Sequence, residues 1–500
     1  MKEKKIVIKN STMGLISQIV TILFTFITRN LFIKYVGMEL LGVNGTFASV
    51  LGTISLAELG FQSAITFKLY KPLNENNQEA INDILIVFKT VYRAIGAIFI
   101  IVSFLLLPFL RFILKGVEVN REIYLYFLLQ AAASAFSYFF AYKRALLYAD
   151  QKDYIAKSLD LLLNVAANLA QIYVLINYGN YTAYLAVKIV QVLCSNLLVQ
   201  LIASKKYSYL HKSKFNKSVF TDLFKDVKNV FAAKVAGYVY TSTDNLVISS
   251  FVSTLSVGYL VNYTTITLSL KRLTQSLLNP VLPSIGHFLV EHTGIEERKQ
   301  KMASYTFIRF VVASAITIPF IVLANQFVTI WVGSEMILSE MIVVLLAADL
   351  YIDFVHCSTL DFINAAGLFK EEKKIEIIGA LTNITVSLML VGFIGIEGVL
   401  TGTVISQIVF WIGRSYVAYK KCIHGTTGDL IMYWIKNAEY ILAFVVITFL
   451  CIKVTGYVMI SQPIVSFVVK GCVCEAIMAL LLGGYYGCCH IICKKHETKH

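Results

Sequence analysis

The chain has 500 residues, of which 57% are hydrophobic and only 15% are charged. Soluble domains carry about 25% charged residues, so a chain this apolar has too little polar surface to cover a water-soluble core. The formal net charge is +14, which in a soluble protein would indicate a nucleic-acid partner. Here the charge lies beside long apolar runs, so a soluble protein is excluded and no nucleic-acid partner is expected.

Apolar runs long enough to cross a bilayer recur along the whole chain. A helix rises about 1.5 Å per residue, so about 20 residues cross a hydrocarbon core of about 30 Å. The first run is long and lacks a small-residue cleavage motif, which indicates a span rather than a signal peptide. The sequence predicts an all-α integral membrane protein with about fourteen transmembrane helices. The expected spans are 12–33, 43–66, 85–107, 123–145, 155–177, 181–202, 229–251, 256–279, 305–328, 337–360, 376–395, 398–418, 437–455 and 464–490.

The positions of Lys and Arg test the span count and give an orientation. If the N-terminus is cytoplasmic, 29 of the 44 Lys and Arg fall in inside segments and 5 fall in outside segments. This bias follows the positive-inside rule. An odd number of spans would destroy the alternation, so both termini are expected to be cytoplasmic.

The longest hydrophilic stretch divides the predicted spans into groups. It is a basic cytoplasmic linker at 204–228, between a six-helix lobe at 1–203 and a second six-helix lobe at 229–421. Two additional transmembrane helices and a tail follow at 422–500. The run from Arg29 to Ile33 aligns with the run from Asp244 to Ile248, as expected for parallel repeats related about the membrane normal.

Several short motifs carry a resemblance to a known family. They are Tyr35-Val36-Gly37, Leu41-Gly42-Val43-Asn44-Gly45, Leu56-Ala57-Glu58-Leu59-Gly60, Leu69-Tyr70-Lys71-Pro72-Leu73, Leu147-Tyr148-Ala149-Asp150-Gln151-Lys152 and Thr243-Asp244-Asn245-Leu246-Val247-Ile248-Ser249. In these motifs the chain resembles bacterial polysaccharide flippases of the Wzx type. These flippases belong to the multidrug/oligosaccharidyl-lipid/polysaccharide (MOP) exporter superfamily.

The resemblance implies a fold, a substrate and a location. The fold is two six-helix lobes forming a V around a cavity, and the last two helices resemble an arrangement that makes a groove for a polyprenyl tail. The implied function is flipping of undecaprenyl-diphosphate-linked oligosaccharide from the inner to the outer leaflet of the bacterial cell membrane, by alternating access, for capsular or exopolysaccharide biosynthesis. The implied partners are this substrate, membrane lipids, a polysaccharide polymerase and glycosyltransferases.

Charged side chains inside spans are the candidate functional residues, because each costs about 2.5–3.5 kcal/mol to insert and usually faces protein or water. A lipid diphosphate needs a wet, cationic passage, and Arg and Lys bind phosphate oxygens. The candidate substrate-binding cations are Arg29, Arg93, Lys271 and Arg272. We expect the inner-half cations to capture the diphosphate and Arg29 to pass it outward. The alternative for these cations is snorkelling toward the headgroups, and Lys271 and Arg272, about 100° apart on a helix, cannot both face one point.

Acidic residues in spans are candidates for a gate or for ion coupling, namely Glu58, Asp244, Asp349 and Asp353. Asp244 aligns with Arg29 in the repeat, so the two could pair as an outward gate; alternatively, Asp244 joins a local polar cluster. Asp349, Asp353 and His356 have spacings of four and three, which place them on one helix face. That face could bind a coupling proton or Na⁺, or it could simply line the cavity.

Other function classes find less support in the sequence. A multidrug exporter for cations would favour an acidic cavity, and a polysaccharide polymerase or ligase would need a sizeable outer loop. Phosphate-binding and dinucleotide glycine motifs are absent from the sequence, so the chain is not expected to hydrolyse ATP or to act as an enzyme. The group Cys488, Cys489, His490, Cys493 and His496 fits no standard zinc spacing, so no metal and no cofactor are expected.

Overall fold

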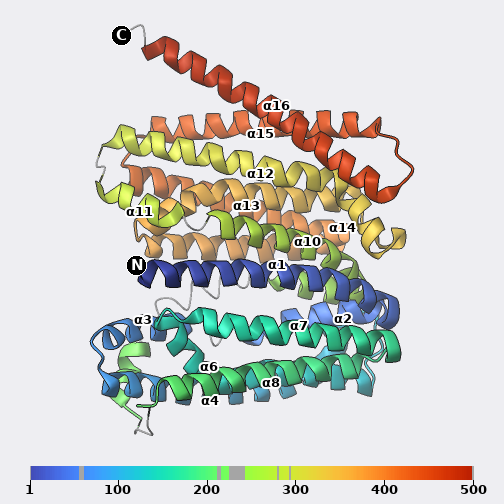
Figure 1. Cartoon of the computed structure of the whole chain (residues 1–500). Coiled ribbons are helices and arrows are strands. Elements are labelled where there is room, and N and C mark those ends of the chain that lie inside the picture. The colour runs from blue at the N-terminus through green and yellow to red at the C-terminus, as the bar shows by residue number, and fades with distance from the viewer. Residues whose placement is uncertain are drawn as a thin grey trace. The chain divides into compact units, whose positions relative to one another are not determined.

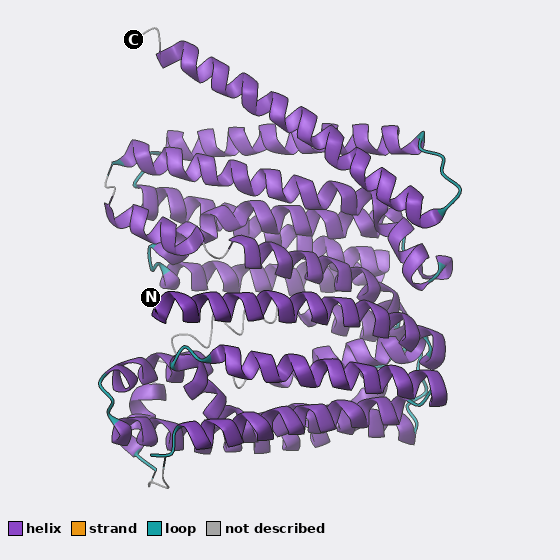
Figure 2. Cartoon of the chain, viewed as in Figure 1, coloured by secondary structure: helices purple, strands orange, loops and turns teal. Residues whose placement is uncertain are grey.

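The structure is a computed structural model that describes residues 2–55, 61–210, 215–224, 242–278, 281–291 and 294–497. Within these ranges all regular secondary structure is helical (Figure 2). Contacts divide the chain into two compact units, Met1–Gly258 and Tyr259–His500. The boundaries expected from the sequence, at 203, 228 and 421, remain predictions.

Unit 1 is built from long helices that pack side by side (Figure 1). Helix α1 packs on α7, and α6 packs on both α4 and α8. The buried side chains of unit 1 are mostly aliphatic and aromatic, and buried Thr, Ser, Asn and Gln side chains lie among them. Within a membrane such helices are held together by close packing and by hydrogen bonds between them. The helices of unit 1 are α1 (Lys2–Val36), α2 (Met38–Ile54), α3 (Phe61–Asn74), α4 (Gln78–Leu106), η2 (Leu107–Phe109), α5 (Leu110–Ile113), α6 (Arg121–Ala149), α7 (Asp153–Tyr178), α8 (Tyr181–Lys206) and the π-helical turn η3 (Ile248–Val252).

Unit 2 has the same kind of construction. Helix α13 packs on α12 and α14, and α12 also packs on α15 and α16 (Figure 1). Its helices are the greater part of α10 (Thr254–Leu278), α11 (Val281–Glu291), α12 (Ile295–Val332), η4 (Ser334–Met336), α13 (Glu340–Ala365), α14 (Phe369–Val417), the π-helical turn η5 (Ala418–Ile423), α15 (Thr427–Gly456) and α16 (Pro463–Glu497).

Ten segments among the described residues are long and apolar enough to cross a membrane. One of them, 369–423, holds two of the expected spans, because α14 leaves helical geometry at Ile394 and Gly395. The break lies at the end of the expected span 376–395, just before the expected span 398–418. Most of the expected span 229–251 and part of 43–66 lie outside the described residues.

Asparagine side chains begin several of the helices. The first turn of a helix leaves backbone N–H groups without partners, and an Asn at the N-cap accepts a hydrogen bond from one of them. Asn77, Asn120 and Asn180 each do so, at distances of 3.0, 3.1 and 2.9 Å. Gly179 ends α7 with a φ of 54°, a left-handed conformation that glycine adopts without a Cβ clash. The tight α7–α8 turn therefore follows from the local sequence.

Candidate functional site: a cationic cavity and a buried charge network

Unit 1 contains a cavity of about 540 Å³ between five of its helices. This size lies within the range of about 300–1,000 Å³ that is typical of small-molecule sites. Helices α1, α2, α6, α7 and α8 all contribute to its wall. The lining residues with polar side chains are Thr21, Thr25, Thr28, Arg29, Asn44, Ser55, Gln130, Ser134, Asn164, Asn168, Gln171, Tyr184 and Lys188.

The charged side chains that line this cavity are both cations, Arg29 from α1 and Lys188 from α8. Its described lining contains neither Asp nor Glu. The Nζ atom of Lys188 donates a hydrogen bond to Oε1 of Gln191 at 3.0 Å, which holds the ammonium group at the wall. A cavity with this lining attracts anions and repels cations.

The nearby carboxylate of Asp160 on α7 does not cancel this positive charge. Arg144 on α6 forms an ion pair with Asp160, and Ser195 on α8 donates a further hydrogen bond to the same carboxylate. Asp160 therefore has its own counter-ion, and the Arg144–Asp160 pair adds no net charge to this region. The cavity keeps its cationic character for this reason.

Hydrogen bonds fix the uncharged part of the wall. Nε2 of Gln130 donates to the hydroxyl of Tyr181 at 2.9 Å, and that hydroxyl donates to Oδ1 of Asn44 at 3.0 Å. Phe32 packs edge-on against Tyr181 and Tyr184, with ring centroids 5.2 and 5.4 Å away. The amide and hydroxyl groups are thus held in place beside aromatic rings, and both kinds of group suit a polar, hydroxyl-rich ligand.

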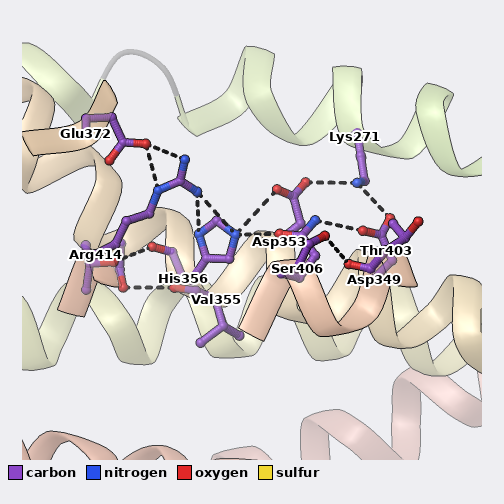
Figure 3. Close-up of polar contacts among 12 residues, drawn as sticks. Lys271, Asp349, Asp353, Val355, His356, Glu372, Thr403, Ser406 and Arg414 are labelled. Atoms are coloured by element: carbon purple, nitrogen blue, oxygen red, sulfur yellow. Dashed lines mark hydrogen bonds and ion pairs between the residues drawn. The ribbon is translucent and has the colours of Figure 1, made fainter. Parts of the chain in front are cut away.

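Unit 2 contains a buried network of charged and polar side chains on α10, α13 and α14 (Figure 3). Nζ of Lys271 lies 3.0 Å from Oδ2 of Asp349 and 3.1 Å from Oδ2 of Asp353, so one ammonium serves two carboxylates. Nε2 of Gln407 donates to Oδ1 of Asp349 at 2.7 Å. Oε1 of Gln407 lies 2.8 Å from Nε2 of His356, which extends the network along α13.

At its other end the network reaches a buried Arg–Glu pair. Nε of Arg414 donates to Oε1 of Glu372 at 2.9 Å, and its NH1 lies 3.2 Å from Nδ1 of His356. A separate ion pair joins Arg309 on α12 to Asp361 on α13. Buried charges in a membrane protein must find such partners because the surrounding medium does not solvate them.

An apolar groove of about 220 Å³ lies between α10, α12 and α16 of unit 2. Its lining residues carry only apolar side chains and include Leu270, Leu323, Phe327 and Phe467. Phe467 belongs to α16, one of the two helices that the sequence predicts in addition to the two lobes. Such a groove suits a hydrocarbon chain.

The structure distributes the candidate residues over different environments. Arg29 lines the cavity of unit 1, whereas Arg93 on α4 and Arg272 on α10 are exposed. Lys271 lies in the network of unit 2 together with Asp349 and Asp353. Asp244 is partly buried in unit 1, and its pairing with Arg29 remains a prediction. Glu58 lies outside the described residues, so its role also remains a prediction.

Comparison with known proteins shows which fold the chain has. No family model and no curated protein matches the chain. Among solved structures, the lipid II flippase MurJ in an inward closed conformation has a TM-score of 0.71 at 14% identity, covering 95% of this chain and 98% of the flippase. An inward-facing multidrug-resistance MATE transporter of the MOP superfamily has a TM-score of 0.61 at 14% identity, covering 79% and 94%.

The chain has the fold of the MOP transporters. A further match is a MOP transporter from Pyrococcus furiosus whose binding pocket is described as having reverse polarity, with a TM-score of 0.57 at 15% identity over 85% of this chain and 97% of that one. The prediction of an all-α membrane protein with a MOP fold is thereby confirmed. The match to the flippase covers more of this chain than the matches to the two MOP-superfamily transporters.

Sequence reasoning missed several residues that the MOP fold brings to these sites. Lys188 was visible as a charge inside a span, but nothing in its neighbourhood assigned it to the same cavity as Arg29. Gln407 and Arg414 lie far along the chain from His356 and were given no role. The sequence does give one hint, because an Arg or Gln side chain inside a membrane helix is costly and therefore needs a polar partner. That hint does not identify the partner.

Proposed function

We propose that this chain is a transporter that flips an anionic lipid-linked oligosaccharide, bound through its diphosphate, from the inner to the outer leaflet of a bacterial cell membrane. The product would serve capsular or exopolysaccharide biosynthesis. Transport proceeds by alternating access, which the MOP fold supports. The observation that carries the proposal is the cavity of unit 1, whose charged lining residues are Arg29 and Lys188.

The chemistry of the cavity matches the polar part of such a substrate. A diphosphate carries negative charges that Arg binds through its planar fork and Lys binds as a point charge. The amide and hydroxyl side chains, among them Asn44, Gln130 and Asn168, match sugar hydroxyl groups as donors and acceptors. The rings of Phe32 and Tyr184 give apolar surfaces for sugar rings.

The apolar groove of unit 2 matches the other part of the substrate. A polyprenyl tail is a hydrocarbon chain, and it can pack by van der Waals contact in a groove lined by Leu270, Leu323 and Phe327. Phe467 on α16 belongs to this groove, which supports a role for that additional helix in binding the tail. The similarity to the lipid II flippase supports an amphiphilic substrate of this kind.

A multidrug exporter is the second candidate, because MATE transporters share the fold. Cationic drugs require acidic side chains, and the lining of the cavity has the opposite sign. The MOP transporter from Pyrococcus furiosus, whose pocket is described as having reverse polarity, shows that the charge of the pocket differs among proteins with this fold. The sign of the charge therefore favours the flippase over the drug exporter.

Flipping assays in vesicles decide between these functions. The purified chain is reconstituted into vesicles that contain either a fluorescent undecaprenyl-diphosphate-linked oligosaccharide or a fluorescent organic cation. The flippase proposal expects faster movement of the lipid label between the two leaflets than in protein-free vesicles, with no transport of the cation. Transport of the cation without movement of the lipid would favour the drug exporter instead.

A further inference from the structure

Unit 2 contains a further pocket, of about 330 Å³, between α12, η5 and α15. Its lining shares no described residue with the apolar groove or with the buried charge network. The floor of the pocket consists of side chains that are at most 5% exposed, namely Thr306, Tyr419, Tyr433, Asn437 and Tyr440. The charged lining residues are Glu296, Lys299, Asp429 and Lys436. A buried polar floor of this size below charged side chains is typical of a ligand site.

Two contacts fix how α12 and α15 lie beside each other (Figure 1). Nζ of Lys299 lies 2.8 Å from Oδ1 of Asp429. Farther along, the rings of Phe310 and Tyr440 stack with their centroids 4.5 Å apart. The two contacts are eleven residues apart on both helices. The helices therefore run in the same direction and in step along the pocket.

The sign of the charge changes in the same order along both helices. On α12, Glu296 precedes Lys299, and on α15, Asp429 precedes Lys436. The rise from Asp429 to Lys436 is about 10 Å. A helical side chain leans toward the N-terminus of its helix, which brings Nζ of Lys436 back toward the carboxylates. The pocket thus presents carboxylates at its outer end and ammonium groups beside and below them.

The hydropathy of the two helices places the pocket at the level of the lipid headgroups. The expected spans begin at 305 and 437, and the four charged lining residues all precede these positions. The exposed side chains of α15 at this level include Ile431, Met432 and Ile435, which are apolar. Exposed apolar side chains beside a membrane span face lipid. The ligand that reaches the pocket from this side is therefore a lipid.

The present partners of the charged lining residues leave them able to bind a ligand. Lys436 is paired with Glu439, and the two side chains are 43% and 50% exposed. Glu296 is paired with Lys299 and is 71% exposed. Exposed ion pairs contribute little to stability. These side chains can therefore exchange their partners for the charges of a headgroup.

We propose that this pocket binds a phospholipid whose headgroup carries a primary ammonium group and a phosphate, as in phosphatidylethanolamine. The ammonium group binds the carboxylates of Glu296 and Asp429, and the phosphate accepts hydrogen bonds from Lys299 and Lys436. The order of these charges matches the order of ammonium, phosphate and acyl chains in a leaflet. The acyl chains continue along the exposed apolar side of α15. The lipid is a bound ligand that holds α15 against α12, and the proposed function does not depend on it.

Native mass spectrometry of the full-length protein with defined lipids tests the site. Phosphatidylethanolamine should bind about tenfold more tightly than phosphatidylcholine or phosphatidylglycerol with the same acyl chains. Choline is a cation that donates no hydrogen bond, and the glycerol headgroup has no cation. Equal affinity of the wild type for the three lipids would overturn the proposal.

Two variants at exposed positions assign the preference to the pocket. Glu296→Gln should bind the three lipids alike, because it removes a carboxylate that recognises the ammonium group. Lys436→Gln should weaken the binding of all three, because it removes a partner of the phosphate. Glu297→Gln is the matched control, since Glu297 is the next residue of α12, is exposed and does not line the pocket. A preference that persists in Glu296→Gln, or that is lost equally in Glu297→Gln, would contradict the assignment.

A soluble ligand with the same headgroup is tested by competition. Free ethanolamine phosphate carries the same two charged groups without acyl chains, so it should not displace phosphatidylethanolamine at equal concentration. Displacement would mean that the pocket binds a soluble zwitterion and would overturn the assignment to a lipid. The unfolding temperature in detergent gives an independent measure, because a ligand of the folded state stabilises it. Phosphatidylethanolamine should raise this temperature in the wild type and in Glu297→Gln more than in Glu296→Gln, and equal increases would contradict the site.

Discussion

Arg29 on α1 and Lys188 on α8 line the same cavity of unit 1, although they lie in the first and the sixth predicted spans. The described lining of that cavity holds no carboxylate, because Asp160 nearby is paired with Arg144. Two cations around one hollow match the charge of the diphosphate that we propose as the bound group. The first prediction tests this pair.

Arg29→Ala and Lys188→Ala should each weaken the binding of a lipid diphosphate. A hydrogen bond to a charged group contributes about 1.5–3 kcal/mol, which corresponds to about 10- to 100-fold in affinity. Arg29→Lys should retain part of the affinity because it keeps the charge without the planar fork. Equilibrium binding of a labelled polyprenyl diphosphate to the purified variants measures the effect. Unchanged affinity in both alanine variants would show that the cavity of unit 1 does not bind the diphosphate.

Arg93→Ala tests whether a second predicted substrate cation, outside the cavity, is needed for transport. The sequence places Arg93 among the substrate cations, and the structure leaves its side chain exposed. If it captures substrate, as the sequence predicts, its removal should abolish transport while leaving expression intact. If it instead snorkels to the headgroups, transport should continue at the wild-type rate. The rate of flipping in vesicles, corrected for the amount of reconstituted protein, separates the two roles.

The apolar groove should affect long-chain substrates only. Leu323→Gln places an amide group among Leu270, Phe327 and Phe467, and an amide beside a hydrocarbon chain without a hydrogen-bond partner costs about 1–3 kcal/mol. Affinity for an undecaprenyl diphosphate should fall about tenfold. Affinity for a short-chain analogue, which does not reach the groove, should stay the same and serves as the control. An equal loss for both chain lengths would indicate general damage to unit 2.

The Arg414–Glu372 pair should be important for folding. Breaking a buried ion pair from one side leaves an uncompensated charge and costs about 3–5 kcal/mol. Glu372→Gln or Arg414→Met should therefore lower the unfolding temperature in detergent strongly. The apolar double variant Glu372→Leu with Arg414→Met should recover much of the loss. Glu371→Gln breaks a solvent-screened surface pair with Lys421 and should leave the unfolding temperature nearly unchanged.

A close contact of α2 and α10 within unit 1 gives a test of the packing. A Cβ atom at Gly42 would overlap the backbone carbonyl of Thr254, and one at Gly258 would lie 2.8 Å from the carbonyl oxygen of Met38. Gly42→Ala should therefore destabilise the protein by about 1–3 kcal/mol. Gly286→Ala on α11, where a Cβ meets no atom within 4 Å, is the matched control. Equal unfolding temperatures for the two variants would contradict this contact.

The fold was predictable because a membrane imposes strong patterns on a sequence. Apolar runs of about 20 residues and the Lys and Arg bias gave the helices, since hydrocarbon excludes unpaired backbone groups. The break of α14 at Gly395 was also anticipated by the boundary between two expected spans. These features depend on residues that are close together along the chain, so one sequence is enough to predict them.

The partners of the charged residues were less predictable. Spacing along α13 correctly grouped Asp349, Asp353 and His356, because helical periodicity is local. That Lys271 serves two of these residues depends on how α10 packs on α13, and no pattern within either helix encodes it. The same holds for Lys188, which reaches the cavity of Arg29 only through the packing of unit 1. Predictions about contacts between helices therefore need the structure.

The central claim is that an anionic lipid passes through a cationic cavity, and charge reversal tests it most directly. The measurement is flipping of labelled undecaprenyl-diphosphate-linked oligosaccharide in vesicles that contain Arg29→Glu or Lys34→Glu. Both residues lie on α1, but Lys34 is exposed and does not line the cavity. The account predicts that Arg29→Glu abolishes flipping and that Lys34→Glu flips at nearly the wild-type rate. Normal flipping by folded Arg29→Glu would contradict it.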